Sequence, residues 1–299
     1  MHTSLITTSE ARPAIARYVS CLRAREILVL QGSALLGAAL ALGRPGVEHV
    51  APLAVLTLAN LCLVAHVFVV NDLANLTTDR VDPARAGGVF TVRGVAPSEM
   101  AGLAGGLLAV SLLLFSTLGV ATISVAVGIA ALSALYSLPP FNWKSRPLLS
   151  SAAHVAGGVL HFLLGYCVAG GIDRRGLATA AFFGLTFAAG HLTQELRDYH
   201  ADVRSTIRTN AVSYGQRPAF AASLLLFGAA QAVLFTLAVQ GVLPRVLAAL
   251  LLLFPIQLRW SFAALAEGLT APAVARLQGR YRVLHALIGV AIVAALWLE

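Results

Sequence analysis

The chain has 299 residues, of which 58% are apolar and 11% charged, and its mean hydropathy is +0.82. These values exclude an ordinary soluble domain and predict a membrane protein with many spans. The formal charge of +8 suits the ends of membrane helices and anionic ligands, so no nucleic acid partner is expected.

Nine apolar runs recur along the chain, most of them near the ~20 residues that a helix needs to cross a bilayer. They cover residues 27–43, 50–70, 101–118, 119–138, 148–170, 176–193, 218–240, 243–263 and 282–298. The sequence therefore predicts an all-α, multi-pass helical bundle of about nine transmembrane helices in the lipid bilayer. We expect one domain over residues 1–299, with a cytoplasmic loop and a short amphipathic piece over 266–282.

The second run closes on a polar motif, NDLANLTTD, over residues 71–79. Asn71, Asn75 and Asp79 follow one another at i, i+4 and i+8, so a helix places them on one ridge. Asp72 points partly off that ridge, and Asp82 comes one turn later.

The sixth run closes in the same way, on QELRDYHAD over residues 194–202. At one constant offset, Gln194, Glu195, Asp198 and Asp202 superpose on the amide and acid positions of the first motif. This repetition predicts two pseudo-repeated halves that present matching ridges to a shared central cavity.

The two motifs hold six of the thirteen acids of the chain, counting Asp82. One such cluster fits equally well a helix end that meets water, but two matched clusters favour a binding site. Carboxylates and amides are ligands for Mg²⁺, which uses one or two carboxylates and fills its other positions with water and phosphate oxygens. Mg²⁺ with a diphosphate would neutralise acids that otherwise repel one another.

The cations predict the orientation. Alternate ends of nine spans place seventeen of the Lys and Arg residues on one side, and only Arg44, Arg174, Arg175 and Arg245 on the other. The richer side, which includes both acidic motifs, is expected to face the cytoplasm from a cell membrane.

Three segments resemble motifs of the UbiA superfamily of intramembrane prenyltransferases. NDLANLTTD resembles its NDxxDxxxD signature, DYHADVRSTIRT (198–209) its second aspartate motif, and ALYSLPPFNWKSRPLLSS (134–151) the segment after its fourth helix. The resemblance runs from about Arg23 to Gly215 and includes a nine-helix plan. It implies Mg²⁺-dependent transfer of a prenyl group from a prenyl diphosphate to a small aromatic or similar acceptor. Asn75 stands where the family usually has Asp, which removes one negative charge.

The resemblance assigns roles to these residues. The expected metal ligands are Asn71, Asn75, Asp79, Asp198 and Asp202, with Asp72 and Glu195 supporting them from behind. The acids expected to act in catalysis are Asp72, Asp79, Asp198 and Asp202. The candidates for the diphosphate oxygens are Arg85, Lys144, Arg146, Arg204 and Arg208, each of which is explained equally well as topogenic charge.

The acceptor pocket is less defined. Asn60, three turns before Asn71 on the same helix, and Tyr136 are the candidates. The alternatives are an interhelical hydrogen bond for Asn60 and an interfacial anchor for Tyr136. Two other functions remain open: a terpene cyclase that acts on the prenyl diphosphate alone, and a non-catalytic membrane relative.

Overall fold

The computed structural model describes residues 14–81 and 86–298, and over these ranges every regular element is a helix. Arg85 and Asp82 lie outside the described residues. Nine helices in the described part are long and apolar enough to cross a membrane. They are α2 (Ala24–Leu42), α3 (Val50–Ala74) with the preceding turn η1 (Val47–His49), α5 (Pro97–Ser116), α6 (Val120–Ser137), α7 (Leu149–Tyr166) with η5 (Cys167–Ala169), α8 (Arg174–Arg204), α10 (Gln216–Val239), η6 (Arg245–Leu253) with α11 (Phe254–Ala266), and α12 (Ala271–Leu298).

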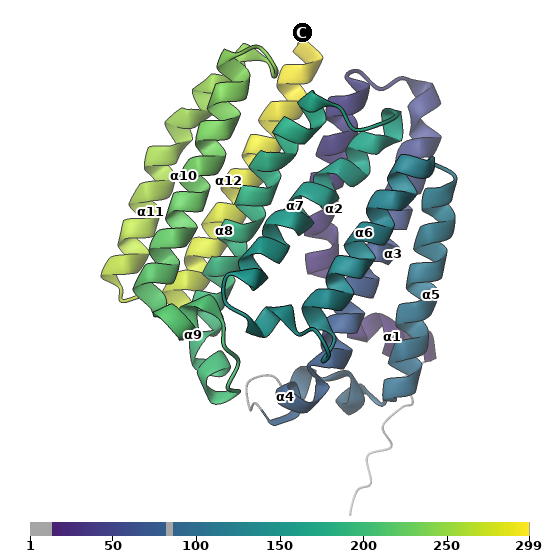
Figure 1. Ribbon diagram of the computed structural model, residues 1–299, viewed down its shortest axis with the longest axis vertical. Coiled ribbons are helices and arrows are strands. Elements are labelled where there is room, and N and C mark those ends of the chain that lie inside the picture. Colours follow the sequence, from purple (N-terminus) through teal and green to yellow (C-terminus); the bar gives the residue numbers. More distant parts are fainter. Residues whose placement is uncertain (1–13, 82–85, 299) are drawn as a thin grey trace, which may run out of the picture.

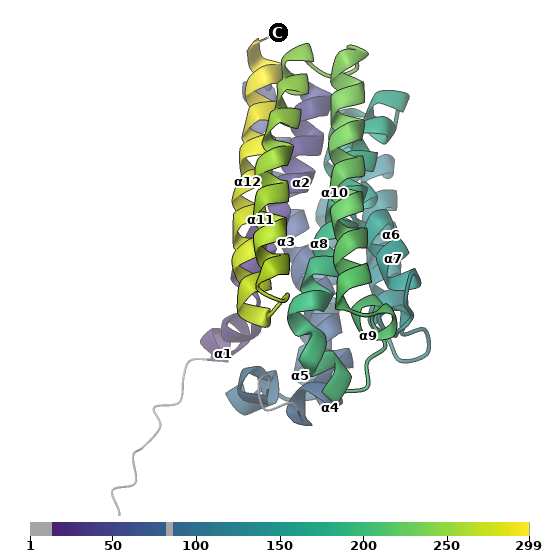
Figure 2. The ribbon, with the colours of Figure 1, turned by 90° about the vertical axis from the view of Figure 1, so that its left-hand side faces the viewer.

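Six short elements join these helices: α1 (Ala14–Cys21), α4 (Leu76–Val81), the 3₁₀ turns η2 (Ala86–Gly88), η3 (Phe90–Arg93) and η4 (Trp143–Ser145), and α9 (Asn210–Tyr214). In two perpendicular views α1, α4 and α9 lie at the same end of the bundle, the lower end in Figures 1 and 2. The ends of α3 and α8 that carry the polar motifs point to this end, so both motifs lie there.

The most extensive helix contacts involve α7 and α8. These two pack along each other, α2 packs on α7, α10 packs on α8, and α3 packs on α5. The last helix, α12, contacts both α8 and the first spanning helix, α2. At the α2–α7 crossing, a Cβ on Gly165 would overlap the carbonyl oxygen of Ala34, so only glycine allows the two backbones to approach this closely.

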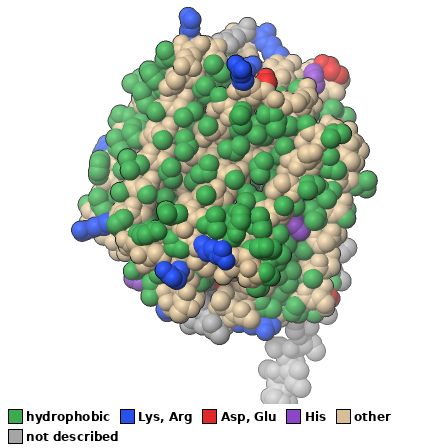
Figure 3. Space-filling view, in the orientation of Figure 1, with side chains coloured by type: hydrophobic (Ala, Val, Ile, Leu, Met, Phe, Trp, Pro, Cys, Tyr) green, Lys and Arg blue, Asp and Glu red, His purple; other side chains and the backbone are tan. Residues whose placement is uncertain are grey.

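The flank of the bundle is apolar, and hydrophobic side chains dominate the face in Figure 3. Large apolar residues such as Leu28, Leu113, Leu225 and Val290 are more than half exposed. A surface of this kind suits hydrocarbon rather than water.

Two boundaries differ from those expected. Helix α8 continues to Arg204, well beyond the apolar run that ends at residue 193. Helix α12 begins at Ala271, so the expectation of a loop through 282 was wrong, and residues 267–270 make the turn. The two halves also differ in backbone: α3 stops at Asn75 and a separate short helix, α4, carries Asp79, whereas α8 passes its acids without a break.

Candidate functional site

The first cluster lies where α3 ends. The Asn75 amide nitrogen donates to Oδ1 of Asn71 at 3.0 Å, as the i, i+4 spacing predicts, and the Asn71 amide donates to Ser137 Oγ at 3.3 Å. Lys144, on η4, donates its ammonium group to Oδ1 of Asn75. The cluster therefore joins α3, the end of α6 and the loop between α6 and α7.

Of the expected diphosphate ligands, Lys144 contacts this cluster directly, through Asn75. Burial lowers the pKa of its ammonium group, and the negative charge of Asp79 acts in the opposite direction. Arg146 follows η4, Arg204 ends α8 and Arg208 precedes α9, and all three are exposed. A half-buried cation beside an amide oxygen and a carboxylate is suited to bind a phosphate oxygen.

Asp72 points to another partner. Its carboxylate pairs with the guanidinium of Arg23, just before α2, and the guanidinium carbon lies 5.5 Å from the centre of the Phe68 ring. The Asp72 carboxylate also experiences the charge of Asp79, so the two acids lie within electrostatic range. Sequence reasoning missed Arg23, because no local spacing connects a residue ahead of the first span to the end of the second.

The second cluster lies along the end of α8, with its acids in different surroundings. Asp202 is buried. Asp198 is partly exposed and accepts from Arg197, with Nε–Oδ1 at 3.0 Å and Nη2–Oδ2 at 3.3 Å. Asp202 and Glu195 both act electrostatically on the Tyr136 hydroxyl of α6, so the α8 acids lie near the first half of the molecule.

Glu195 lies in a structural contact between α8 and α9. It is 3% exposed, and its two oxygens accept from the Asn210 amide at 3.0 Å and the Ala211 backbone N–H at 3.1 Å. The carboxylate thus fixes α9 against α8. The sequence offered no signal for Asn210, which also bonds to Ser150 at 3.1 Å.

Asn60 lies away from both clusters in a network between helices. It is fully buried, its amide nitrogen donates to Gln31 at 2.8 Å, and its oxygen lies 3.0 Å from Nε2 of His161. Because both ends of the amide are engaged, this geometry favours the interhelical role over contact with an acceptor. Tyr136, in contrast, lies edge-on to two imidazole rings near the second cluster.

The donor set suits Mg²⁺ by its chemistry. Among the described residues no three Asp, Glu, His or Cys side chains gather in a metal-binding group. Mg²⁺ does not require such a group, because one or two carboxylates with amide, water and phosphate oxygens complete its coordination. Asn71, Asn75 and Asp79 provide hard oxygen donors of this kind.

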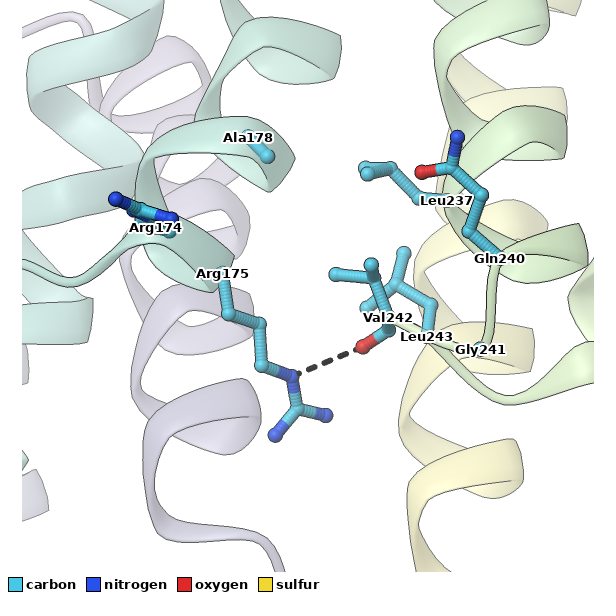
Figure 4. Close-up of a pocket in the computed structure, with 8 residues that line it drawn as sticks. All are labelled: Arg174, Arg175, Ala178, Leu237, Gln240, Gly241, Val242 and Leu243. Atoms are coloured by element: carbon cyan, nitrogen blue, oxygen red, sulfur yellow. Dashed lines mark hydrogen bonds between the residues drawn. The ribbon is translucent and has the colours of Figure 1, made fainter.

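Two cavities lie elsewhere. A cavity of about 610 Å³ lies at the far end of α8, where Arg175 Nε donates to the carbonyl oxygen of Val242 at 3.1 Å and Gln240 contributes a polar side chain (Figure 4). A second, of about 460 Å³, has an apolar lining from α7, α8, α9 and α10 and includes Asn210. Neither contains a residue of the two acid ridges.

Over the described ranges, nine spanning helices with amides, acids and cations at one end define a multi-pass membrane protein with a polar site at the mouth of its bundle. The model of the UbiA prenyltransferase family matches residues 32–288, and the chain belongs to this family. No curated protein sequence matches the chain.

Solved structures share the fold at low sequence identity. A UbiA homolog from Archaeoglobus fulgidus bound to GPP and Mg²⁺ is 17% identical over 93% of this chain and 99% of its own, with a TM-score of 0.73. The same homolog bound to DMAPP and Mg²⁺ gives 16% identity over 93% and 99%, with a TM-score of 0.70. A digeranylgeranylglyceryl phosphate synthase is 15% identical over 95% and 99%, with a TM-score of 0.70.

Proposed function

We propose that this protein is an Mg²⁺-dependent intramembrane prenyltransferase that moves a prenyl group from a prenyl diphosphate to a small aromatic or similar acceptor. The observation that carries the proposal is Lys144 bonded to Asn75, beside Asp79, at the end of the bundle where α8 brings Asp198 and Asp202. The family match and the relatives bound to GPP or DMAPP with Mg²⁺ support it.

The roles follow from the chemistry of the groups. Asn71, Asn75 and Asp79 from one half, with Asp198 and Asp202 from the other, would hold Mg²⁺, which when bound stabilises the charge of the leaving diphosphate. Lys144 binds a diphosphate oxygen directly, and Arg85, Arg146, Arg204 and Arg208 supply further positive charge. Arg23 holds the Asp72 carboxylate, so Asp72 supports the site through an ion pair.

The rest of the substrate meets apolar helices. The prenyl chain passes from the polar end into the bundle, where water is excluded and a carbocation survives long enough to react. The mouth of the site faces the cytoplasm of a cell-membrane protein, because most cations lie on that side of the predicted topology.

The test is product analysis with the purified full-length chain in lipid nanodiscs. The protein is given GPP, DMAPP and longer prenyl diphosphates, each with and without a panel of aromatic acids, in MgCl₂ or in EDTA. We expect diphosphate release in MgCl₂ only, together with a prenylated acid identified by mass spectrometry. A hydrocarbon formed without any acid would identify a cyclase, and absence of diphosphate release from every donor would refute the enzymatic proposal.

A further inference from the structure

Four rings gather deeper in the bundle than the acids of α8. His154 of α7 and His191 of α8 are stacked, with centroids 3.5 Å apart and an interplanar angle of 8°. Tyr136 of α6 lies edge-on to both, at 5.0 and 6.4 Å, and Phe187 covers His154 at 5.6 Å. The role proposed above for the acids and cations leaves this cluster without a function.

Glycines bring the two imidazoles together. A Cβ on Gly158 of α7 would lie 2.7 Å from the carbonyl oxygen of Phe183, and one on Gly184 of α8 would lie 2.8 Å from that of Val155. The two backbones therefore approach closely, and His154 and His191 follow within about two turns of this crossing. The stack therefore results from the close packing of α7 against α8, and no loop contributes to it.

The hydrogen-bond partners define where a proton can bind. His154 Nδ1 lies 2.8 Å from the carbonyl oxygen of Ser150, and a carbonyl only accepts, so Nδ1 carries the hydrogen and Nε2 of the neutral ring carries a lone pair. His191 Nε2 lies 2.9 Å from Oε1 of Glu195, within ion-pairing distance. Two charged imidazoles stacked at 3.5 Å would repel each other, so the pair has room for one added proton and not two, and Glu195 is placed to act as its counter-charge.

The position of the stack matches the path of the prenyl chain. His191, Glu195, Asp198 and Asp202 follow at spacings of four, three and four residues, so they share one face of α8. A rise of about 1.5 Å per residue puts His191 roughly 10 Å deeper than Asp198. Tyr136 directly precedes Ser137, the partner of Asn71, so the rings also adjoin the first cluster.

We propose that the His154–His191 pair is the proton acceptor of the reaction, an inference that rests on the proposed function. The bond between prenyl C1 and oxygen breaks, and its electron pair leaves with the diphosphate. The acceptor carbon bonds to C1, its C–H bond then breaks, and those electrons restore the aromatic ring. The proton passes to Nε2 of His154. Glu195 balances the added positive charge through His191. The proton is released to water when the diphosphate leaves the site.

The test separates ionisation of the donor from loss of the proton. Purified wild-type protein and the variants His154→Gln and His191→Gln are given GPP, Mg²⁺ and the panel of aromatic acids. Diphosphate release is measured alongside two classes of product. A prenylated acid or a hydrocarbon forms only if a C–H bond breaks, whereas geranyl alcohol forms without breaking a C–H bond. We expect release to continue while the ratio of C–H-loss product to alcohol falls by about 10²-fold, the usual contribution of a positioned base.

His285→Gln is the matched control. His285 Nδ1 lies 2.8 Å from the carbonyl oxygen of Tyr281 and its ring lies against Phe227, so it repeats the local setting of His154, on α12. This variant should keep the wild-type product ratio. Added imidazole should restore the ratio in His154→Ala, whereas pyrrole, which has the same size but no basic nitrogen, should not.

The remaining outcomes are also decisive. Variants with the wild-type product ratio, or folded variants that lose diphosphate release and product together, would overturn the proton acceptor and leave prenyl transfer standing. Geranyl alcohol as the sole wild-type product would overturn both the proton acceptor and transfer to the aromatic acids tested, and would leave only cleavage of the prenyl diphosphate standing. Wild-type protein that releases no diphosphate would remove the proposed function, and the proton acceptor with it.

Discussion

At the scale of single residues, Asn75 connects the polar end of α3 to the α6–α7 loop. Its amide donates to Asn71 and accepts from Lys144, so one side chain orients both an expected metal ligand and the cation beside it. The amide supplies an oxygen without charge, whereas Mg²⁺ binds more strongly where that oxygen is anionic. The charge of the side chain at position 75 should therefore set the Mg²⁺ concentration that the site requires.

Replacement of Asn75 by Asp should lower the Mg²⁺ concentration that gives half-maximal diphosphate release, by about three- to tenfold, because the new carboxylate attracts both Mg²⁺ and Lys144. Release is measured against Mg²⁺ with the donor unchanged. Asn142→Asp adds the same charge two residues from Lys144, off the ridge, and should leave the Mg²⁺ dependence as it is. If Asn75→Asp changes neither the Mg²⁺ dependence nor the rate, Asn75 is not a ligand, and Asp72 with Asp82 become the residues to test.

Asp79→Ala and Asp198→Ala should each reduce diphosphate release by at least about 10²-fold while the protein stays folded, because each removes an anionic oxygen donor from the metal site. Release is measured at limiting Mg²⁺, and folding by thermal unfolding in detergent. Glu267→Ala, which removes an exposed acid paired with Arg276, should retain the wild-type rate. Normal turnover in either Asp variant would exclude that residue from the ligand set.

Local spacing predicted neighbouring side chains within one helix, but it predicted no specific contact between side chains of different helices. The i, i+4 pattern anticipated the Asn71–Asn75 bond. The partners from other elements, Arg23 for Asp72 and Asn210 for Glu195, lie 49 and 15 residues away from them along the chain. Such pairings depend on how the helices pack, which a single sequence does not encode in any short pattern.

At the scale of elements, the α2–α7 crossing depends on the absence of a side chain at Gly165. Gly165→Ala should lower the free energy of unfolding by about 1–3 kcal/mol or more, since the added methyl overlaps the α2 backbone at Ala34. Thermal unfolding in detergent measures the change. Gly105→Ala is the control: Gly105 is helical and a Cβ there meets nothing within 4 Å, so that variant should be neutral or slightly stabilised. Equal stability of both variants would show that α2 and α7 can move apart at this crossing without loss of stability.

The sequence located the nine spans found among the described residues but misjudged one boundary of α8 and one of α12. Apolar runs indicate the part of a helix that lies in hydrocarbon, whereas a helix continues for as long as its residues favour it. QELRDYHADVR holds several good helix formers, so α8 extends to Arg204 and carries its acids on a continuous helix. AVARLQGRYR does the same at the start of α12.

At the scale of the whole molecule, the distribution of Lys and Arg predicts which end faces the cytoplasm. Single cysteines are introduced into a chain whose Cys21, Cys62 and Cys167 are replaced by alanine. Arg146→Cys, Arg208→Cys and Arg276→Cys should react with a membrane-impermeant maleimide only from the cytoplasmic side, and Arg174→Cys and Arg245→Cys only from the other. All five positions are exposed, so access depends on the side of the membrane. Labelling of positions 146 and 208 from opposite sides would contradict the hypothesis that the two halves share one site.

The contact between α2 and α12 also constrains how the molecule is made. Leu36 of α2 lies against Gly289, where a Cβ would come within 3.1 Å of it, and Arg44 donates to the carbonyl oxygen of Trp297. Of the nine described spans, a ribosome synthesises α2 first and α12 last, so the contact between them forms only after α12 has been made. Until then, the α12-facing side of α2 is bordered by lipid or by an insertion factor. A chain cut short before residue 271 therefore keeps both acid motifs yet cannot close its bundle.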